Sequence, residues 1–325
     1  MERLFTPFSL DGVELVNRFV FPPIKTAYGN PDGKVTDGQL SFYRQIARNG
    51  PGLIILEPVA VTPEGREHPK QLSVHLPDSA QELKKIVEVI HGEGRLACLH
   101  LNHAGAAANP KATGAKPKAP SSCSCAASGQ QAEELTEAEI QDILAGYESA
   151  AEKAKKANFD VLEIQAGHGY LVSQFLNGKI NKREDRFGQD RQLFVREVIS
   201  AVRRSAGEMA LILRISGDEM SPEYGLPREE LPSLLDFAQE AGGPEDEHQH
   251  QDRERNNILQ LERNAKDCGP DRFEHAQGQT AQHSARNIAD AAHHRGGERL
   301  ESGDKADKVI DDAHVQAPHH AGRPG

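Results

Sequence analysis

The chain has 325 residues, 37% of them hydrophobic and 27% charged, and its formal net charge at pH 7 is −11. This balance is typical of a folded protein that is large enough for one barrel or two average domains, and the negative charge argues against nucleic acid or anionic membranes as partners. The sequence contains no apolar run of membrane-spanning length and no signal-peptide pattern in MERLFTPFSL, and its four cysteines are widely spaced. We therefore expect a cytoplasmic protein without a disulfide framework.

The first predicted element is a small hairpin, in which the triplets Phe8-Ser9-Leu10 and Val13-Glu14-Leu15 flank Asp11-Gly12, a pair that supplies the positive φ of a tight turn. Five short apolar runs follow, each succeeded by an amphipathic helical pattern. We expect these strands at residues 19–22, 53–57, 96–101, 160–165 and 210–215. Capping boxes predict the starts of three of these helices, and the fifth helix, which follows the last strand, is expected at 228–241. The boxes are Thr36/Gln39, Ser79/Glu82 and Thr136/Glu139.

Alternating strands and helices predict an α/β fold with a parallel sheet and right-handed crossovers. An open dinucleotide-binding sheet would carry G-x-G-x-x-G after its first strand, but PPIKT stands there instead. The pattern therefore favours a (β/α)8 barrel of the TIM type. Five of the eight strand–helix units are legible in the sequence.

The composition changes abruptly at Gly242-Gly243. Residues 243–325 hold nine of the 15 histidines but only nine Leu, Ile, Val or Phe, roughly 11% of the segment, which is too few to offset the entropy of ordering it. We therefore divide the chain into an incomplete barrel domain, 1–242, and a disordered tail, 243–325. We interpret the tail as a continuation in a shifted reading frame, a hypothesis that translation of the other two frames beyond codon 242 would test.

Polar residues gather where the predicted strands end, which is the functional face of a barrel. Arg214 and Lys25 supply positive charge there, and His100, Gln165 and His168 supply hydrogen-bond donors. Such a set favours a flat, hydrogen-bonding cofactor with an anionic centre. An alternative is a metal-dependent hydrolase, in which the two histidines just named and His103 would join a carboxylate around Zn²⁺.

Several motifs carry a resemblance to a known family. They are LFTPFSLDGVELVNRFVFPPIKTAYG, LNHAG, KAPS, FDVLEIQAGHGYLVSQFL, NKREDRFG and LRIS, in this order. This arrangement, over about residues 3–242, resembles the Old Yellow Enzyme family of FMN-dependent NAD(P)H oxidoreductases. The most specific part is HGYL followed by N-x-R-x-D-x-F-G. Its Arg183 and Asp185 are expected to tie a loop together rather than to contact substrate.

The resemblance implies FMN over the mouth of the barrel. Pro23, Ile24 and Ala60 would line the flavin, and Lys25 would occupy the position of a residue that tunes it. His100 stands where the family has a flavin-contacting glutamine. Arg214 would face the N1/C2-carbonyl edge of the flavin, where positive charge stabilises the anionic reduced form. No metal site is expected.

The resemblance also implies the roles of three further residues. Gln165 and His168 match the pair that holds the substrate carbonyl oxygen, and Tyr170 matches the tyrosine that donates a proton to the substrate α-carbon. The implied activity is reduction of the C=C bond of a small α,β-unsaturated carbonyl compound, with NAD(P)H as hydride donor. The physiological substrate, the choice between NADH and NADPH, and the oligomeric state stay open.

The missing units have a physical consequence. A sheet of five strands leaves two unpaired edges, so we expect poor solubility and weak FMN retention for this chain. A non-functional truncated product is therefore a further alternative. The Ser- and Ala-rich stretch PSSCSCAASG, residues 120–129, contains Cys123 and Cys125 and is expected to form a flexible lid, with a reactive cysteine pair as the alternative.

Overall fold

The computed structural model describes residues 2–125, 127–219 and 225–241. The chain divides into two units, Met1–Arg263 and Asn264–Gly325, and every described residue belongs to the first of them. The segment 243–325, for which the sequence predicts disorder and a shifted reading frame, lies outside the described residues.

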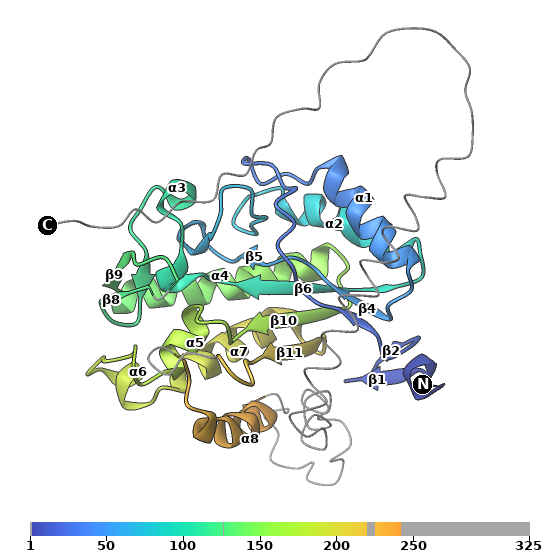
Figure 1. Cartoon of the computed structure of the whole chain (residues 1–325). Coiled ribbons are helices and arrows are strands. Elements are labelled where there is room, and N and C mark those ends of the chain that lie inside the picture. Colours follow the sequence, from blue (N-terminus) through green and yellow to red (C-terminus); the bar gives the residue numbers. More distant parts are fainter. Residues whose placement is uncertain (1, 126, 220–224, 242–325) are drawn as a thin grey trace, which may run out of the picture. The chain divides into compact units, whose positions relative to one another are not determined.

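A curled parallel sheet forms the centre of the described part (Figure 1). Its strands are β3 (Val20–Phe21), β4 (Leu53–Ile55), β6 (Leu96–Asn102), β10 (Val161–Gln165) and β11 (Ala210–Arg214). They pair in the order β11-β10-β6-β4-β3, and every neighbouring pair is parallel. The five predicted strands are thus confirmed, with ends that differ by up to two residues. A strand that the sequence pattern does not predict, β5 (Val59–Ala60), pairs with the last residues of β6.

Each strand of the sheet is followed in the chain by a long helix. These helices are α1 (Asp37–Arg48), α2 (Ser79–His91), α4 (Glu137–Lys156), α7 (Leu193–Ala206) and α8 (Leu231–Ala241). The capping boxes of Thr36 and Thr136 are both complete. The predicted box at Ser79/Glu82 is wrong, because Asp78 is the N-cap of α2 and the Ser79 hydroxyl group donates instead to carbonyl oxygens of the preceding loop.

The two faces of the sheet bury different sets of side chains, because successive residues of a strand point to opposite sides. One face packs against the helices and contributes Ile54, Leu99, Leu162 and Leu213 to the larger hydrophobic cluster. The other face contributes Leu53, Cys98, Val161 and Ala210 to a second cluster, which Leu10 and Leu15 complete. These two leucines come from the predicted hairpin, β1 (Phe8–Leu10) and β2 (Val13–Leu15), whose turn residues Asp11 and Gly12 have positive φ. Burying each leucine contributes about 1.5–3 kcal/mol, so the hairpin is firmly held under the sheet.

The segment between β6 and α4 carries a small three-stranded sheet instead of an irregular loop. Its strands are β7 (Lys118–Ala119), β8 (Cys123–Ser124) and β9 (Gln131–Glu134), in the order β7-β9-β8. Cys123 and Cys125 are both free thiols, and Cys125 is buried. The remaining short elements are η1 (Glu2–Phe5), η2 (Pro63–Gly65), η3 (Gly105–Ala107), α3 (Pro110–Thr113), α5 (Leu171–Leu176), α6 (Arg186–Gln189) and η4 (Arg228–Glu230). Within the described ranges, no helix is long and apolar enough to cross a membrane.

Candidate active site

The parallel strands bring the predicted site residues to one edge of the sheet. Gln165 and Arg214 are paired in register as the last residues of β10 and β11, and His100 lies near the end of β6. Ala60 is fully buried at the end of β5. Pro23, Ile24 and Lys25 follow β3, and His168 and Tyr170 follow β10. Arg214, His168 and Tyr170 therefore lie at the same edge of the sheet.

Glu163 anchors the centre of this edge. It is 1% exposed, and its Oε1 accepts hydrogen bonds from Nδ1 of His100 (2.5 Å) and from Nε of Arg214 (2.8 Å). Burial acts to raise the pKa of Glu163, but the hydrogen bonds from these two partners and the charge of Arg214 outweigh it, so the pKa lies below its usual value. The carboxylate therefore stays ionised and fixes both basic side chains.

Gln165 sets the hydrogen-bond directions of the two histidines beside it. The backbone N–H of Gly167 donates to Oε1 of Gln165 (3.0 Å), which turns the side-chain nitrogen toward the rings. That nitrogen donates to Nδ1 of His168 (3.1 Å) and to Nε2 of His100 (3.4 Å). Because Nδ1 of His168 accepts this hydrogen bond and therefore carries no hydrogen, the ring hydrogen of the neutral imidazole is on Nε2. Both amide hydrogens of Gln165 are thus engaged within the protein, and His168 is the member of the expected pair with a ring N–H left to offer.

The backbone of the 166–170 loop holds His168 in an unusual position. His168 has φ +60°, a left-handed conformation that is uncommon for residues other than glycine, and its backbone N–H donates to Oγ of Ser216 (2.8 Å). Gly167 packs so tightly that an added Cβ atom would lie 2.6 Å from Oγ of Ser216. Burial, and then the charge of Arg214, lower the pKa of His168, so its ring is neutral at pH 7.

Tyr170 and Lys25 meet at a carboxylate that the sequence analysis did not identify. The Tyr170 hydroxyl group donates to Oε2 of Glu67 (2.6 Å), and Nζ of Lys25 lies 2.7 Å from the same oxygen. Burial raises the pKa of Tyr170 to about 12, and the charge of Glu67 adds to the shift. The Tyr170 ring meets the ring of His168 edge-on at 6.5 Å, which joins the two halves of the site. Glu67 lies in an irregular loop, where no residue pattern points toward Tyr170.

Two buried residues at the end of β6, Asn102 and His103, have side-chain polar atoms without a hydrogen-bond partner among the described residues. Among the described residues, neither side-chain polar atom of Asn102 has a partner, although the residue is 0% exposed. Nδ1 of His103 accepts from the backbone N–H of Gly105 (3.1 Å), and burial lowers the pKa of His103 to about 3. The histidine therefore braces the loop after β6. The described part of the chain contains no group of three His, Cys, Asp or Glu side chains that could hold a metal ion.

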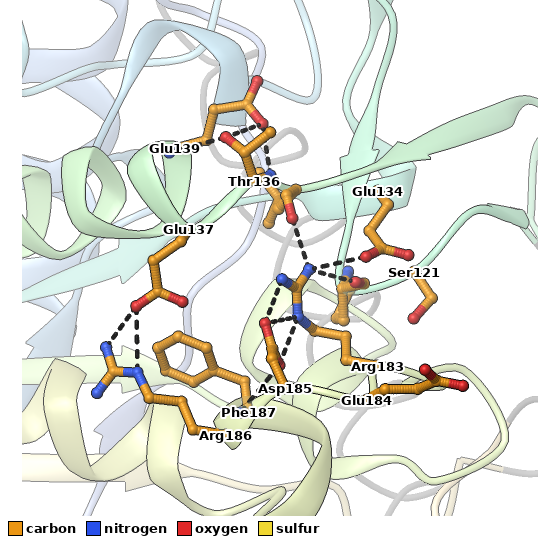
Figure 2. A network of polar contacts seen from close by, with 12 residues as sticks. Ser121, Glu134, Thr136, Glu137, Glu139, Arg183, Glu184, Asp185, Arg186 and Phe187 are labelled. Carbon is orange, nitrogen blue, oxygen red and sulfur yellow. Dashed lines mark hydrogen bonds and ion pairs between the residues drawn. The ribbon is translucent and has the colours of Figure 1, made fainter.

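A second polar network lies outside the mouth, and Figure 2 shows how it surrounds Arg183. Nη1 of Arg183 donates to the carbonyl oxygens of Pro120 (2.8 Å) and Leu135 (2.5 Å), and its Nε donates to both carboxylate oxygens of Asp185. The side chain of Arg183 is 6% exposed. Arg183 and Asp185 therefore connect α6 to the small sheet, as the sequence analysis expected.

One cavity of the described part lies away from the strand ends. It has a volume of about 360 Å³ and lies between α5, the start of α7 and α8, where Arg191 lines it. Arg191 there donates to the carbonyl oxygen of Leu176 and pairs with Glu230. We place the candidate active site at the strand ends and not at this cavity, because the acidic, basic and amide side chains that contact one another lie at that edge of the sheet.

Comparisons with known proteins identify the family of the chain. The sequence profile of the NADH:flavin oxidoreductase / NADH oxidase family matches residues 3–302, beyond the residue 242 at which the resemblance in the sequence was expected to end. An NADPH dehydrogenase from Clostridium acetobutylicum is 31% identical over 242 residues, which are 73% of this chain and 71% of that protein. An NADH oxidase from Thermoanaerobacter brockii is 35% identical over 246 residues, which are 74% of this chain but 38% of that protein.

A solved structure provides the matching fold. Old Yellow Enzyme from Pichia sp. AKU4542 superimposes with a TM-score of 0.67 and 28% identity, over 73% of this chain and 67% of that one. The curled parallel sheet is accordingly a half-barrel of the predicted (β/α)8 type.

Proposed function

This chain belongs to the NADH:flavin oxidoreductase / NADH oxidase family, and from that premise we propose that it binds FMN at the strand-end edge and uses NAD(P)H to reduce the C=C bond of α,β-unsaturated carbonyl compounds. The single observation that carries the proposal is the joined set of Arg214, His168 and Tyr170 around one mouth. These side chains offer a cation, a neutral ring donor and a phenol, the groups that such a reduction uses.

The residues present fit a flavin. A flavin ring system presents alternating carbonyl oxygens and ring nitrogens, which need both donors and acceptors. Arg214 supplies a guanidinium group that Glu163 holds by Nε (2.8 Å). The orphaned amide of Asn102, two residues beyond His100 on the same side of β6, offers a buried donor and acceptor at the same edge. We assign Pro23, Ile24 and Ala60 to the apolar contacts of the ring, and Lys25, His100 and Arg214 to its polar edge. When bound, FMN supplies the hydride chemistry that links NAD(P)H oxidation to reduction of an electron-poor double bond.

His168 would orient the substrate carbonyl group. Its Nε2–H is free to donate because Gln165 donates to Nδ1. A neutral imidazole that is held in one tautomer is a directional donor for an oxygen on which negative charge develops. Gln165 would thus act on the substrate through His168, a change from the expectation that both side chains contact the oxygen.

Tyr170 would deliver the proton at the α-carbon. Its phenol remains protonated at neutral pH, since its pKa is raised to about 12. Proton delivery requires that the hydroxyl hydrogen, which now points to Glu67, turns toward the substrate. The hydroxyl oxygen needs no displacement for this turn.

The two alternative functions differ in their support. A chain impaired in FMN retention remains an alternative within the same family, because the described strands leave β3 and β11 at the two ends of the sheet. A zinc hydrolase has less support. The two ring nitrogens of His100 are hydrogen-bonded to Glu163 and Gln165, and Nδ1 of His103 accepts a hydrogen bond from the loop after β6.

Flavin content of the full chain tests the proposal. The purified protein is titrated with FMN, and binding is followed by quenching of flavin fluorescence. NADPH oxidation is then measured with and without cyclohexenone, and bound zinc is measured on the same sample. We expect FMN binding, enone-dependent NADPH oxidation and loss of that oxidation in Tyr170→Phe. FMN binding without enone reduction would indicate an impaired enzyme, and zinc without flavin would contradict the proposal.

A further inference from the structure

Glu67 has contacts that the proposed function does not use. Its side chain is 4% exposed, yet one of its carboxylate oxygens contacts both the Tyr170 hydroxyl group (2.6 Å) and Nζ of Lys25 (2.7 Å). Its other oxygen, Oε1, has no partner among the described residues. A buried carboxylate costs free energy unless it is paired and hydrogen-bonded, and these two contacts supply the hydrogen bond and the pairing cation.

The loop that carries Glu67 is fixed to the rest of the site. The carbonyl oxygen of Gly65 accepts from the backbone N–H of Ala104 (2.9 Å), and that of Arg66 accepts from the N–H of Asn109 (2.9 Å). The backbone N–H of Glu67 itself donates to Oε1 of Gln71 (2.7 Å). Glu67 is therefore held in place independently of Tyr170, as a positioning group must be.

Lys25 is the cation that balances Glu67. Burial lowers the pKa of the neighbouring His68, so that ring is neutral at pH 7. Arg66 turns its guanidinium group to the backbone oxygens of Pro69 and Gln71. Although burial acts to lower the pKa of Lys25, its contact with Glu67 raises it overall, and half of its side chain remains exposed to water.

We propose that Glu67 is a positioning residue that joins the Tyr170 hydroxyl group to the Lys25 ammonium group, so that Lys25 returns a proton to Tyr170 after each turnover. This inference rests on the proposed function, in which Tyr170 is the proton donor. The three side chains come from separate segments, and one oxygen atom links them.

The proton balance of the cycle closes with one proton drawn from the solvent in each turnover. The O–H bond of Tyr170 breaks as a C–H bond forms on the substrate, which leaves a phenolate beside Lys25. An N–H bond of the ammonium group then breaks and the phenolate regains its proton. The neutral amine takes a proton from water, which reaches it because Lys25 lies half-exposed at the rim. The ammonium group lies 5.9 Å from the centre of the Tyr170 ring, close enough to stabilise the phenolate.

The first test measures the titration of Tyr170 in the full chain without flavin. Tyrosinate absorbance is followed against pH, and the same curve for a Tyr170→Phe partner is subtracted so that the other tyrosines cancel. Removing the Glu67 charge by Glu67→Gln should lower the pKa of Tyr170 by about one unit or more, because the carboxylate disfavours the phenolate. Glu67→Asp should recover part of the shift. Glu64→Gln, on the same loop, is the matched control and should leave the pKa unchanged.

The second test separates proton supply from charge. Lys25→Arg keeps a cation for Glu67, but a guanidinium group does not release its proton at working pH. With FMN-loaded enzyme reduced beforehand, the first turnover of cyclohexenone is measured beside steady-state turnover, and the ratio of the steady-state rate to the first-turnover rate should fall about tenfold or more in Lys25→Arg. The same ratio in the two proteins would overturn proton return by Lys25.

The two tests fail in distinguishable ways. A chain that binds no FMN contradicts the proposed function, and the titration still decides the role of Glu67. If the pKa of Tyr170 is the same in Glu67→Gln as in the unchanged chain, the inference is overturned whatever the flavin result.

Discussion

The side-chain nitrogen of Gln165 lies 3.1 Å from Nδ1 of His168, and this contact assigns the ring proton of His168 to Nε2. The direction of the glutamine is itself fixed by the Gly167 N–H, which donates to Oε1. Gln165 therefore determines what His168 can donate, although its own amide hydrogens face inward.

Replacing Gln165 by Met, which keeps the size but removes both donors, should release the tautomer of His168. We expect kcat/KM for enone reduction to fall about 10- to 100-fold, because the donor to the substrate oxygen is no longer fixed. Nitrogen NMR of labelled His168 would report the loss of the single tautomer. Gln192→Met, at the start of α7 where the side chain makes no capping bond, is the control. Unchanged ring-nitrogen shifts would contradict the assignment.

His103 should make the chain less stable in acid. Its pKa is about 3 in the folded chain and 6.5 when unperturbed, so below pH 6.5 the unfolded chain binds a proton that the folded chain excludes. Stability due to this group is complete above pH 6.5 and falls toward pH 3 with a slope that approaches about 1.4 kcal/mol per pH unit. Urea unfolding at a series of pH values should show a smaller slope in His103→Gln than in the unchanged chain. Identical slopes would rule out a buried neutral His103.

Arg183 and Arg186 form a matched pair for testing the network in Figure 2. Arg183 is 6% exposed and bonds two backbone oxygens, whereas Arg186 is 46% exposed and pairs with Glu137 and Glu197. Arg183→Lys should lower the free energy of unfolding by about 2–4 kcal/mol, because a lysine cannot make the forked contacts. Arg186→Lys should cost less than about 1 kcal/mol. Equal losses in urea unfolding would mean that burial does not distinguish the two sites.

Gly167 and Gly169 should respond differently to alanine. A Cβ atom on Gly167 would lie 2.7 Å from the backbone nitrogen of Ser216, whereas one on Gly169 would meet nothing within 4 Å. Gly169→Ala should therefore lower the free energy of unfolding by only about 1–2 kcal/mol, the strain of placing an alanine at a φ of +69°. Gly167→Ala should cost a similar or larger amount through overpacking and should also displace His168, with loss of enone reduction. Full activity in Gly167→Ala would show that the loop can move without consequence.

Much of the fold follows from local patterns in the sequence. Apolar runs that are buried on both faces mark the five parallel strands, and the boxes at Thr36 and Thr136 mark two helix starts. The box at Ser79 does not form, because a serine in the first turn can bond the preceding loop as well as the helix. The strands β5 and β7 have only two residues each, too few for any periodicity to be recognised.

The candidate site was predictable to the extent that it lies on strand ends. Parallel strands end at the same edge, so His100, Gln165 and Arg214 can be grouped from the sequence pattern. The pairing of Glu67 with Tyr170 cannot, because it joins a loop to a residue 103 positions away through side-chain directions alone. The inward direction of the Gln165 amide likewise depends on one backbone N–H.

The hairpin beneath the sheet also bears on how the chain is assembled during synthesis. β1 and β2 are made first and pair locally, which takes microseconds. The layer that Leu10 and Leu15 join includes Val161 and Ala210, which leave the ribosome much later. The earliest segment must therefore wait for some of the last described strands before its leucines are covered, and closing that layer is a late, long-range event that slows folding.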